Sequence, residues 1–398
     1  MRMFEKNELK LLWPFYLEAF LSYTLFFAPA FFVIYFVDAG LSLFQVSLVF
    51  AIQGLAALLF EIPTSAIADI YGRKFSVILS YALEGLGFFM LFFSKNFYFI
   101  LFCFAFIGFA STFSSGSKEA WAVDLIKARN RKLMNNFFSK VQILDNAGMI
   151  LAGILGAFLV WAAGTSLIWI FAGISFLVSC FILAFSKEVF RKRAIVHPYK
   201  VLKNQIRGSL GFSYKHPVLF YLLLATFVFI FGASFDIDVS WVPLLKSLGV
   251  SDYIFGYFWS ATSLVIIASS FISMKFLKKN RERNFIIMFV LLSALNSFLV
   301  LAVYNKIFGI VLYLLSFFFF HGMKPASRIY FHRFVPNKMR ATIGGFENML
   351  WGVAAVLALP ISGLLVDAVG PRYTIAVAGV MSILTVLVYL MIREKKQN

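Results

Sequence analysis

Several ionisable side chains stand inside apolar stretches that carry almost no other charge. His321, Lys324 and Arg328 follow one another at i, i+3 and i+7, so on a helix they form a single stripe. A charged group at membrane depth is energetically costly, and by default it indicates the path of a substrate or an ion. The residues that we predict to bind substrate or to couple protons are Glu18, Lys118, Glu119, Asp236, Asp238, His321, Lys324 and Arg328.

Helical geometry predicts which of these groups meet. Glu18 lies about two turns inside the start of its helix, where its carboxylate can reach Lys118 or Lys324. Asp236 and Asp238 stand two residues apart and point to nearly opposite sides of a helix, so we expect only one of them to face the interior. The cations favour an anionic or zwitterionic group on the substrate, but the acids leave its sign open.

Some of these residues also have a structural interpretation. Arg328 is close enough to the predicted interface to extend its guanidinium into water, and Lys118 with Glu119 can do the same. Asp238 can instead form a local bond near the proline that follows it. Histidine titrates near neutral pH, which suits His321 to carry a proton, but a neutral histidine in a hydrogen-bond network is an equal alternative.

The composition predicts an all-α membrane protein. The chain has 398 residues, of which 61% are hydrophobic and 14% charged, and its mean hydropathy is +0.87. A soluble core of this size does not need so much apolar surface. Apolar runs of about 20 residues, the length that crosses about 30 Å of hydrocarbon, predict twelve transmembrane helices at 11–36, 43–66, 76–94, 97–124, 134–160, 166–186, 217–243, 251–274, 284–304, 306–331, 340–366 and 372–392.

Basic residues concentrate in alternate loops, and this asymmetry predicts the topology. Basic sets occur at 73–74, 127–132, 275–283 and 333–340, and the largest lies at 187–215, whereas the loops between them hold single cations. By the positive-inside rule both termini are cytoplasmic, and we expect a multi-pass protein of the inner (cytoplasmic) cell membrane. The net charge of +18 therefore does not indicate nucleic-acid binding, for which no motif is present.

The sequence offers little that is typical of an enzyme or a metalloprotein. Cys103 and Cys180 lie in apolar runs, which indicates neither a disulfide framework nor a metal site. The four histidines are scattered, and no metal-ligand spacing, nucleophile motif or ATP-binding loop occurs. The first apolar run is too long for a cleavable signal peptide and lacks a small-residue cleavage site, so we expect it to remain as a helix.

The two halves of the chain resemble each other. Gly116-Ser117-Lys118 matches Gly322-Met323-Lys324 at a shift of 206 positions, and Gly164 matches Gly370 at the same shift. The pattern predicts two pseudo-symmetric six-helix bundles, at 1–186 and 217–398, joined by a basic cytoplasmic linker at 187–216. Two such halves are what a rocker-type transporter requires.

The turn between the second and third predicted helices reads Ser65-Ala66-Ile67-Ala68-Asp69-Ile70-Tyr71-Gly72-Arg73-Lys74. It resembles the Gly-x-x-x-Asp-x-x-Gly-Arg-Lys signature of the major facilitator superfamily, with Ser65 in place of the first glycine. The Arg340-Ala341-Thr342 segment that opens the eleventh helix also resembles bacterial members. The resemblance extends over essentially the whole chain, and it implies that helices 1, 4, 7 and 10 line a central cavity.

In that family the signature turn latches the outward-facing state. The resemblance implies that Arg73 pairs with Asp124 at the inner end of the fourth helix, while an acid near a helix N-terminus gains from the helix dipole. The alternative is that Arg73 and Lys74 only obey the positive-inside rule. The predicted latch consists of Asp69, Gly72, Arg73, Lys74, Asp124 and Arg340.

The chain also departs from the family pattern. The corresponding turn of the second half, 275–283, has lost the signature, and Lys278 stands near the position of its acid. Phe104 occupies the place of an arginine that proton-coupled exporters carry in the fourth helix. Of the exporter motif in the fifth helix only three glycines survive, and these can simply permit close helix packing; they are Gly148, Gly153 and Gly156.

We therefore expect a secondary active transporter that moves a small organic molecule by alternating access, as a proton-coupled exporter. A proton gradient takes the place of a cofactor, and the expected partners are membrane lipid and a small-molecule substrate, with the protein as a monomer. Two alternatives remain open within the fold, which are uptake of an anionic or zwitterionic metabolite by symport and translocation of a lipid or glycolipid. An enzyme or a transporter-like receptor is the disfavoured reading.

Overall fold

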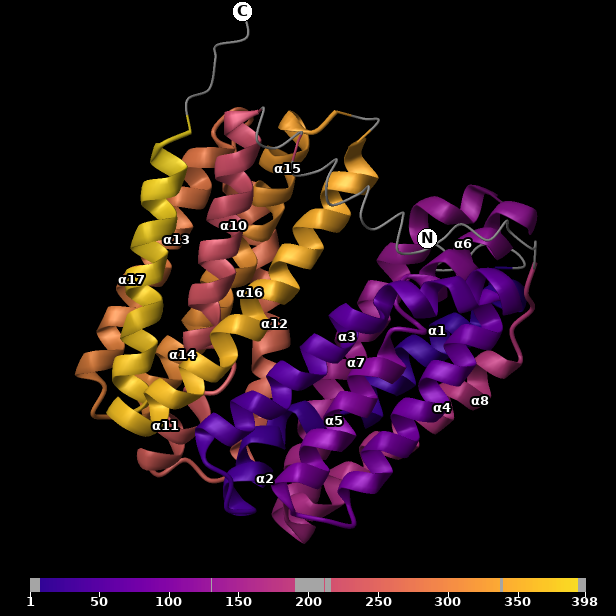
Figure 1. Cartoon of the computed structure of the whole chain (residues 1–398), viewed down its shortest axis with the longest axis horizontal. Helices are drawn as coiled ribbons and strands as arrows, with labels where there is room; N and C mark the ends of the chain where they lie inside the picture. Colours follow the sequence, from indigo (N-terminus) through magenta and orange to yellow (C-terminus); the bar gives the residue numbers. More distant parts are fainter. Residues whose placement is uncertain (1–7, 130, 190–210, 212–215, 337–338, 393–398) are drawn as a thin grey trace, which may run out of the picture. The chain divides into compact units, whose positions relative to one another are not determined.

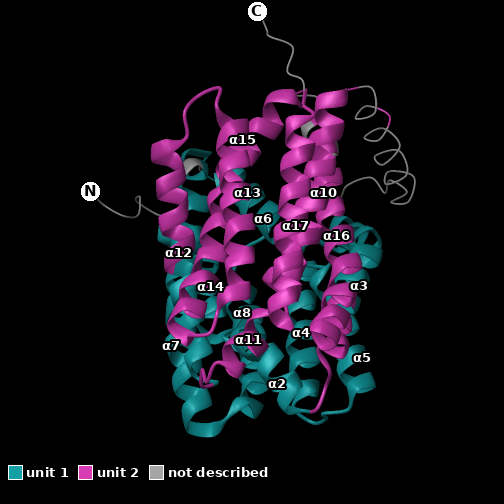
Figure 2. Cartoon of the chain, turned by 90° about the vertical axis from the view of Figure 1, so that its left-hand side faces the viewer, with its two compact units in different colours: residues 1–39, 52–199, 252–263 teal, residues 40–51, 200–251, 264–398 magenta. Residues whose placement is uncertain are grey.

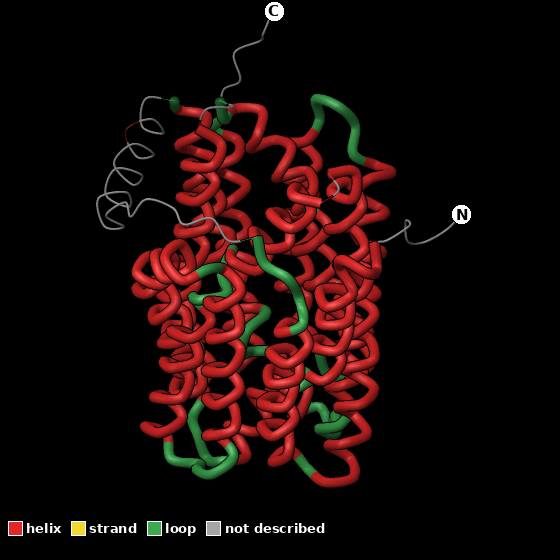
Figure 3. The backbone as a smooth tube through the Cα atoms, turned by 90° about the vertical axis from the view of Figure 1, so that its right-hand side faces the viewer, coloured by secondary structure: helices red, strands yellow, loops and turns green. Residues whose placement is uncertain are grey.

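The computed structural model describes residues 8–129, 131–189, 211, 216–336 and 339–392. These residues form helices joined by short turns, with no strand among them (Figure 3). The helices, labelled in Figure 1, are α1 (Glu8–Leu25), α2 (Phe32–Asp38), α3 (Leu43–Tyr71), α4 (Arg73–Leu91), α5 (Phe97–Ser111), α6 (Ser117–Arg129), α7 (Met134–Ala163), α8 (Ile168–Ala184), α10 (Pro217–Asp236), α11 (Trp241–Ser247), α12 (Ile254–Phe276), α13 (Glu282–Leu299), α14 (Lys306–Gly322), α15 (Lys324–Phe334), α16 (Arg340–Val369) and α17 (Pro371–Leu390).

The all-helical membrane architecture expected from the sequence is confirmed. Within the described residues, eleven helices or broken helix pairs are long and apolar enough to cross a membrane. The predicted number of twelve is not confirmed on this criterion, because α5 has only 15 residues and the helix after it, α6, is polar. Large apolar side chains such as Phe158 and Phe181 stay exposed, at 63% and 66%, as lipid-facing residues do.

Four of the predicted spans are divided into two helices. The breaks separate α1 from α2, α5 from α6, α10 from α11 and α14 from α15. The prediction of one continuous helix is therefore wrong at 11–36, 97–124, 217–243 and 306–331. Gly116, with φ of +65°, precedes α6, and Pro325, the second residue of α15, has no N–H to donate to the carbonyl of His321. Glycine and proline thus account for two of the breaks.

The helices group into two compact units, shown in separate colours in Figure 2. Unit 1 comprises residues 1–39, 52–199 and 252–263, and unit 2 comprises residues 40–51, 200–251 and 264–398. The first part of α3 belongs to unit 2 and the first part of α12 to unit 1. The contiguous bundles 1–186 and 217–398 stay a prediction, and most of the proposed linker 187–216 lies outside the described residues.

Unit 1 packs around small residues. Within it α1 lies against α7 and α8, and α4 lies against α5 and α8. Gly153 of α7 contacts the carbonyl of Gly256 and the side chain of Ser260, so no Cβ fits there. Gly148 and Gly156 in the same helix approach the end of α1 and the turn after it just as closely. These glycines therefore have the packing role that the sequence suggested.

Unit 2 has its own apolar core. Helix α10 lies against α16 and α17, and α13 lies against α14 and α17. Buried side chains from these helices and from α15 form one cluster that contains Phe289, Tyr330 and Tyr389, and Phe227, Phe320 and Trp351 pack against it. The stacked rings of Phe285 and Phe289, 4.5 Å apart, lie in this core. Aromatic packing of this kind adds about 0.5–1.5 kcal/mol per pair beyond area burial.

The internal repeat is visible in the helix boundaries. Helices α7 and α16 begin and end 206 positions apart, and α2 and α11 begin and end 209 positions apart. Gly40 and Gly249, which follow α2 and α11, are also 209 positions apart and both have positive φ. Helices α1, α4 and α5 also begin 209 positions before α10, α13 and α14. The shift therefore changes from 209 to 206 after the start of α5, and residues of α1 correspond to residues of α10 that are 209 positions later.

Gly153→Ala tests the close packing of α7. The added methyl group must displace the backbone of Gly256, and overpacking of this kind typically costs about 1–3 kcal/mol. We expect the melting temperature of the protein in detergent to fall by several degrees. Gly344→Ala is the matched control, because nothing lies within 4 Å of a Cβ built there, and alanine in its helix should raise the melting temperature. Equal melting temperatures for the two variants would contradict the packing.

Candidate functional site

The Glu18 carboxylate lies in the interior of unit 1 and forms an ion pair with Lys118. Glu18 is 1% exposed, and its Oε2 lies 2.5 Å from Lys118 Nζ. Its Oε1 accepts a hydrogen bond of 3.0 Å from the hydroxyl of Tyr81 on α4, whose ring centre is 6.0 Å from the ammonium. A buried carboxylate without such partners would be strongly destabilising, so the ion pair and the tyrosine hydroxyl stabilise Glu18 inside an apolar bundle.

A cavity of about 240 Å³ opens beside this pair. Serine and tyrosine hydroxyls, with the Glu18–Lys118 pair, form the polar part of its wall, and phenylalanine rings form the apolar part. The lining residues are Glu18, Ser22, Tyr23, Phe26, Tyr81, Lys118, Ser175, Phe176 and Ser179. The volume is below the range of about 300–1,000 Å³ typical of drug-sized ligands, but it is enough for several water molecules.

Asp145 is a member of this group that the sequence predictions missed. It lies on α7 and interacts electrostatically with Tyr23, Lys118 and Glu18. Its Oδ1 is buried and has no hydrogen-bond partner among the described residues. Asp145 is the single ionisable residue between Val141 and Ala163, so the signal that singled out Glu18 was present for it as well.

In unit 2, Lys324 lies among aromatic rings. Its Nζ is 4.5 Å from the ring centre of Phe320 and 5.7 Å from that of Trp351. Both distances are within the range of cation–π attraction. His321 is a close neighbour, because its imidazole packs against Phe320 and feels the charge of Lys324. In the part of the chain that the structure describes, no carboxylate forms an ion pair with Lys324.

The helix break changes the predicted stripe of cations. His321 ends α14, whereas Lys324 is the first residue of α15 and Arg328 lies one turn further on. Arg328 is exposed, as its structural interpretation requires, and its charge acts on Glu347 of α16. Glu119, next to Lys118, is also exposed. The structure thus brings His321 and Lys324 together, while Arg328, one turn further along α15, is exposed.

The two acids of the seventh predicted helix differ in exposure. Asp236 is 5% exposed, and its Oδ1 accepts hydrogen bonds from Trp241 Nε1 at 2.5 Å and Ser316 Oγ at 3.3 Å. Asn296 Nδ2 donates to the same serine at 2.9 Å. Asp238 lies in the turn between α10 and α11 and is exposed. Asp236 therefore belongs to a buried polar network that joins α10, α11, α13 and α14.

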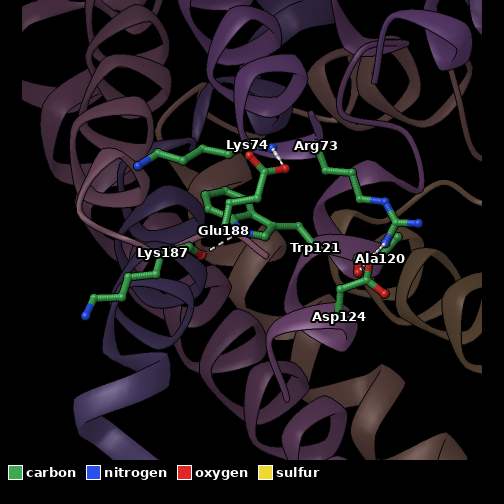
Figure 4. Close-up of polar contacts among 7 residues, drawn as sticks. All are labelled: Arg73, Lys74, Ala120, Trp121, Asp124, Lys187 and Glu188. Atoms are coloured by element: carbon green, nitrogen blue, oxygen red, sulfur yellow. Dashed lines mark hydrogen bonds and ion pairs between the residues drawn. The ribbon is translucent and has the colours of Figure 1, made fainter. Parts of the chain in front are cut away.

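The predicted latch turn is held by a set of contacts at one end of unit 1 (Figure 4). Arg73 Nη1 lies 2.6 Å from Asp124 Oδ2 and donates to the carbonyl of Ala120 at 2.5 Å. The ion pair expected between Arg73 and Asp124 is thus present. Lys74 Nζ donates to the carbonyls of Ala184 and Ser186 at the end of α8. Both cations of the signature tie helices together, beyond any effect on topology.

The residues after α8 complete this end of unit 1. Glu188 Oε1 accepts a 3.0 Å hydrogen bond from the backbone N–H of Lys74, and the carbonyl of Lys187 accepts one from Trp121 Nε1 at 2.8 Å (Figure 4). Gly72 has φ of +105°, and a Cβ there would stand 2.9 Å from the Glu188 carboxylate. The signature glycine is therefore needed for both its backbone angle and its space.

The remaining latch residues are less informative. Asp69 is exposed, and it borders a cavity of about 330 Å³ together with Arg73, Asp124 and Glu188. Arg340 opens α16, but its side chain lies outside the described residues. Among the described residues no group of three or more His, Cys, Asp or Glu side chains is placed to hold a metal ion.

Unit 2 keeps the contacts of this turn with the charges exchanged. Glu282, the first residue of α13, pairs with Arg333 of α15 at 2.5 Å, as Arg73, the first residue of α4, pairs with Asp124 of α6. Arg283 Nη2 donates to the carbonyl of Leu390 at the end of α17, as Lys74 does at α8. The signature is lost from the sequence of the second half, as predicted, but Glu282 and Arg283 form two contacts of the same kind as those of Arg73 and Lys74.

Comparison with known proteins identifies relatives along nearly the whole chain. Residues 15–355 match the family model described as Major Facilitator Superfamily. The uncharacterized MFS-type transporter YxaM of Bacillus subtilis (strain 168) is 22% identical over 375 residues, which is 92% of each chain.

Solved structures show the same fold. The nucleoside transporter NupG superposes with a TM-score of 0.76 at 13% identity, over 95% of this chain and 98% of that one. A bacterial homologue of the iron transporter ferroportin in the inward-facing state gives 0.76 at 14%, over 97% and 99%. A peptide transporter POT in complex with sulfate gives 0.75 at 14%, over 98% and 94%.

Exchanging the charges of the Arg73–Asp124 pair tests whether its polarity matters. Each of Arg73→Asp and Asp124→Arg places two like charges together, so we expect each to lower the melting temperature by about 2–4 °C, as loss of roughly 1 kcal/mol does. Unit 2 holds a pair of the reverse polarity, so exchanging both charges should be tolerated. The double variant should recover most of this loss. Lys127→Asp, at an exposed cation bordering the same cavity, should leave the melting temperature unchanged. Losses that simply add in the double variant would rule out the ion pair.

Proposed function

The chain belongs to the Major Facilitator Superfamily, and from this premise we propose that it exports a small organic molecule in exchange for protons. Membership makes it a multi-pass membrane transporter rather than an enzyme. Membership supports secondary transport, and alternating access with a proton gradient as the energy source is our proposal for it. We assign it to the cytoplasmic membrane, with both termini inside.

The observation that carries the proton coupling is the buried Glu18–Lys118 pair. Its two opposite charges compensate each other at a depth where a lone charge is costly. Protonation of Glu18 removes the partner of Lys118 and leaves an unpaired ammonium in the apolar interior. Such a change in charge alters the relative stability of two conformations, which is what coupling requires.

The surroundings of this pair support a proton pathway. Asp145 provides a second carboxylate near the single ammonium of Lys118, so the ammonium has an alternative partner when Glu18 is protonated. The hydroxyls of Tyr81, Ser22 and Ser175 line the adjacent cavity, whose size suits water rather than an organic substrate. Hydroxyl groups and water are the usual carriers of protons between carboxyl groups.

Export is the direction favoured by the resemblance of the sequence to twelve-helix exporters of the family. The structural relatives include proteins described as nucleoside and peptide transporters, so small polar organic molecules are reasonable test compounds. The Arg73–Asp124 and Lys74–Ala184 contacts support the latch proposal, because they tie the turn to α6 and α8 at one end of unit 1. The alternatives, symport and lipid translocation, give different results in the test that follows.

Inverted membrane vesicles acidified by respiration test the proposal. A transporter that exchanges its substrate for protons should release protons from these vesicles when the substrate is added outside. An acridine dye reports the resulting rise in internal pH. Nucleosides, dipeptides, aromatic carboxylates and amphipathic amines form the test panel. We expect Glu18→Gln to lower the dye response by at least about tenfold, or about 1.4 kcal/mol, while Asp38→Asn, an exposed acid at the end of α2, leaves it unchanged.

Each alternative has its own signature in these vesicles. Compound uptake that acidifies the interior further would indicate symport in place of exchange. Movement of a labelled phospholipid between leaflets, with no response to the soluble panel, would indicate a lipid translocator. A wild-type response in Glu18→Gln would remove Glu18 from the coupling step and reassign it to a structural role.

A further inference from the structure

The two halves of the chain place a lysine at equivalent positions. Lys118 and Lys324 are 206 positions apart, and each stands in the first turn of the second segment of a broken helix, α6 or α15. The equivalence of the flanking helices is independent of the lysines, since α7 and α16 have the same length and the same shift. The environments of the two ammonium groups can therefore be compared position by position.

The acids near Lys118 are replaced by aromatic residues near Lys324. Asp145 corresponds to Trp351 at the shift of 206, and Trp351 is one of the rings against the Lys324 ammonium. Glu18 corresponds to Phe227 at the shift of 209 that relates α2 to α11. Phe227 packs against the same apolar cluster as Phe320 and Trp351. Unit 2 thus lacks both carboxylates that accompany the lysine in unit 1.

This exchange leaves the positive charge of Lys324 without neutralisation. Cation–π contacts attract an ammonium without removing its net charge. His321 supplies no negative charge, and the guanidinium of Arg328 is itself cationic and accompanies Glu347. A half-buried cation flanked by flat apolar surfaces is a receptor for an anion that carries a flat apolar body.

We propose that Lys324, with Phe320 and Trp351, binds the anionic group of an aromatic organic anion, which is the substrate of this transporter. That the bound anion is the transported substrate depends on the proposed function, but the binding site itself is inferred from residues of unit 2 alone. The ammonium pairs with a carboxylate, sulfonate or phosphate, and the rings of Phe320 and Trp351 pack against the planar part. Lys118 has no such role, because Glu18 already occupies its ammonium.

The test is ligand-dependent thermal stabilisation of the purified full-length protein in an uncharged detergent. The probes are aromatic carboxylates, sulfonates and phosphates of one and two rings, each paired with the neutral amide or alcohol of the same shape. We expect at least one of the anions to raise the melting temperature by about 2 °C or more, with no shift from its neutral counterpart. Lys324→Gln should abolish the shift, and Lys324→Arg should retain it.

The correspondence between the units supplies a sharper variant. Phe227→Glu places a carboxylate where unit 1 has Glu18, so it should pair with Lys324 and weaken anion binding by at least about tenfold. Phe227→Gln has nearly the same shape without the charge and should keep the binding. The melting temperatures without ligand show whether each variant is folded. Equal weakening by Glu and Gln would show that packing and not charge is responsible, and would overturn the proposal.

Failure of this inference differs from failure of the proposed function. If no anion of the panel stabilises the protein, or if Lys324→Gln binds anions as the wild type does, the anion site is wrong. Proton release in vesicles by a neutral or cationic compound would then leave the proposed function intact. Anion binding that depends on Lys324, without any proton movement, would instead preserve the site and remove the proton coupling.

Discussion

A lysine inside an apolar bundle must have its charge compensated, and the two units of this protein meet that requirement differently. In unit 1, Lys118 has a carboxylate at 2.5 Å and a second acid nearby. In unit 2, Lys324 has aromatic rings at 4.5 and 5.7 Å and no ion-pair partner in the described residues. In our proposal the first arrangement exchanges protons without an outside ligand, whereas the second is complete only when an anion binds. We therefore assign the two units different roles, because each compensates the charge of its lysine in a different way.

The sequence predicted the fold and, as one of two alternatives for Glu18, its ion pair with Lys118, but not the arrangement around them. Long apolar runs and alternating basic loops were sufficient for the helical membrane architecture, since both reflect the bilayer and not particular contacts. Glu18 and Lys118 were found because charges in such runs are rare. The breaks at Gly116 and Pro325 were missed because the spans were predicted from length and average hydropathy, which a single glycine or proline hardly changes, although both residue types are themselves signals of a helix break.

Aromatic residues were the other limit of prediction. Among 52 phenylalanines and 7 tryptophans, nothing in the sequence separates Phe320 and Trp351 from residues that only face lipid. Asp145 was recognisable as an isolated acid in an apolar helix, and its omission was avoidable. The charge-exchanged pair of Glu282 and Arg333 could not be recognised in the same way. A sequence signature fixes which residue is acidic and which is basic, whereas an ion pair requires only two opposite charges.

The most direct measurement is an experimental structure of the protein with a bound aromatic carboxylate. Our account predicts the carboxylate within about 3 Å of Lys324 Nζ, with the aromatic body against Phe320 and Trp351 and the Glu18–Lys118 pair intact. A carboxylate bound to Lys118, with Glu18 displaced, would contradict the division of labour on which the account depends.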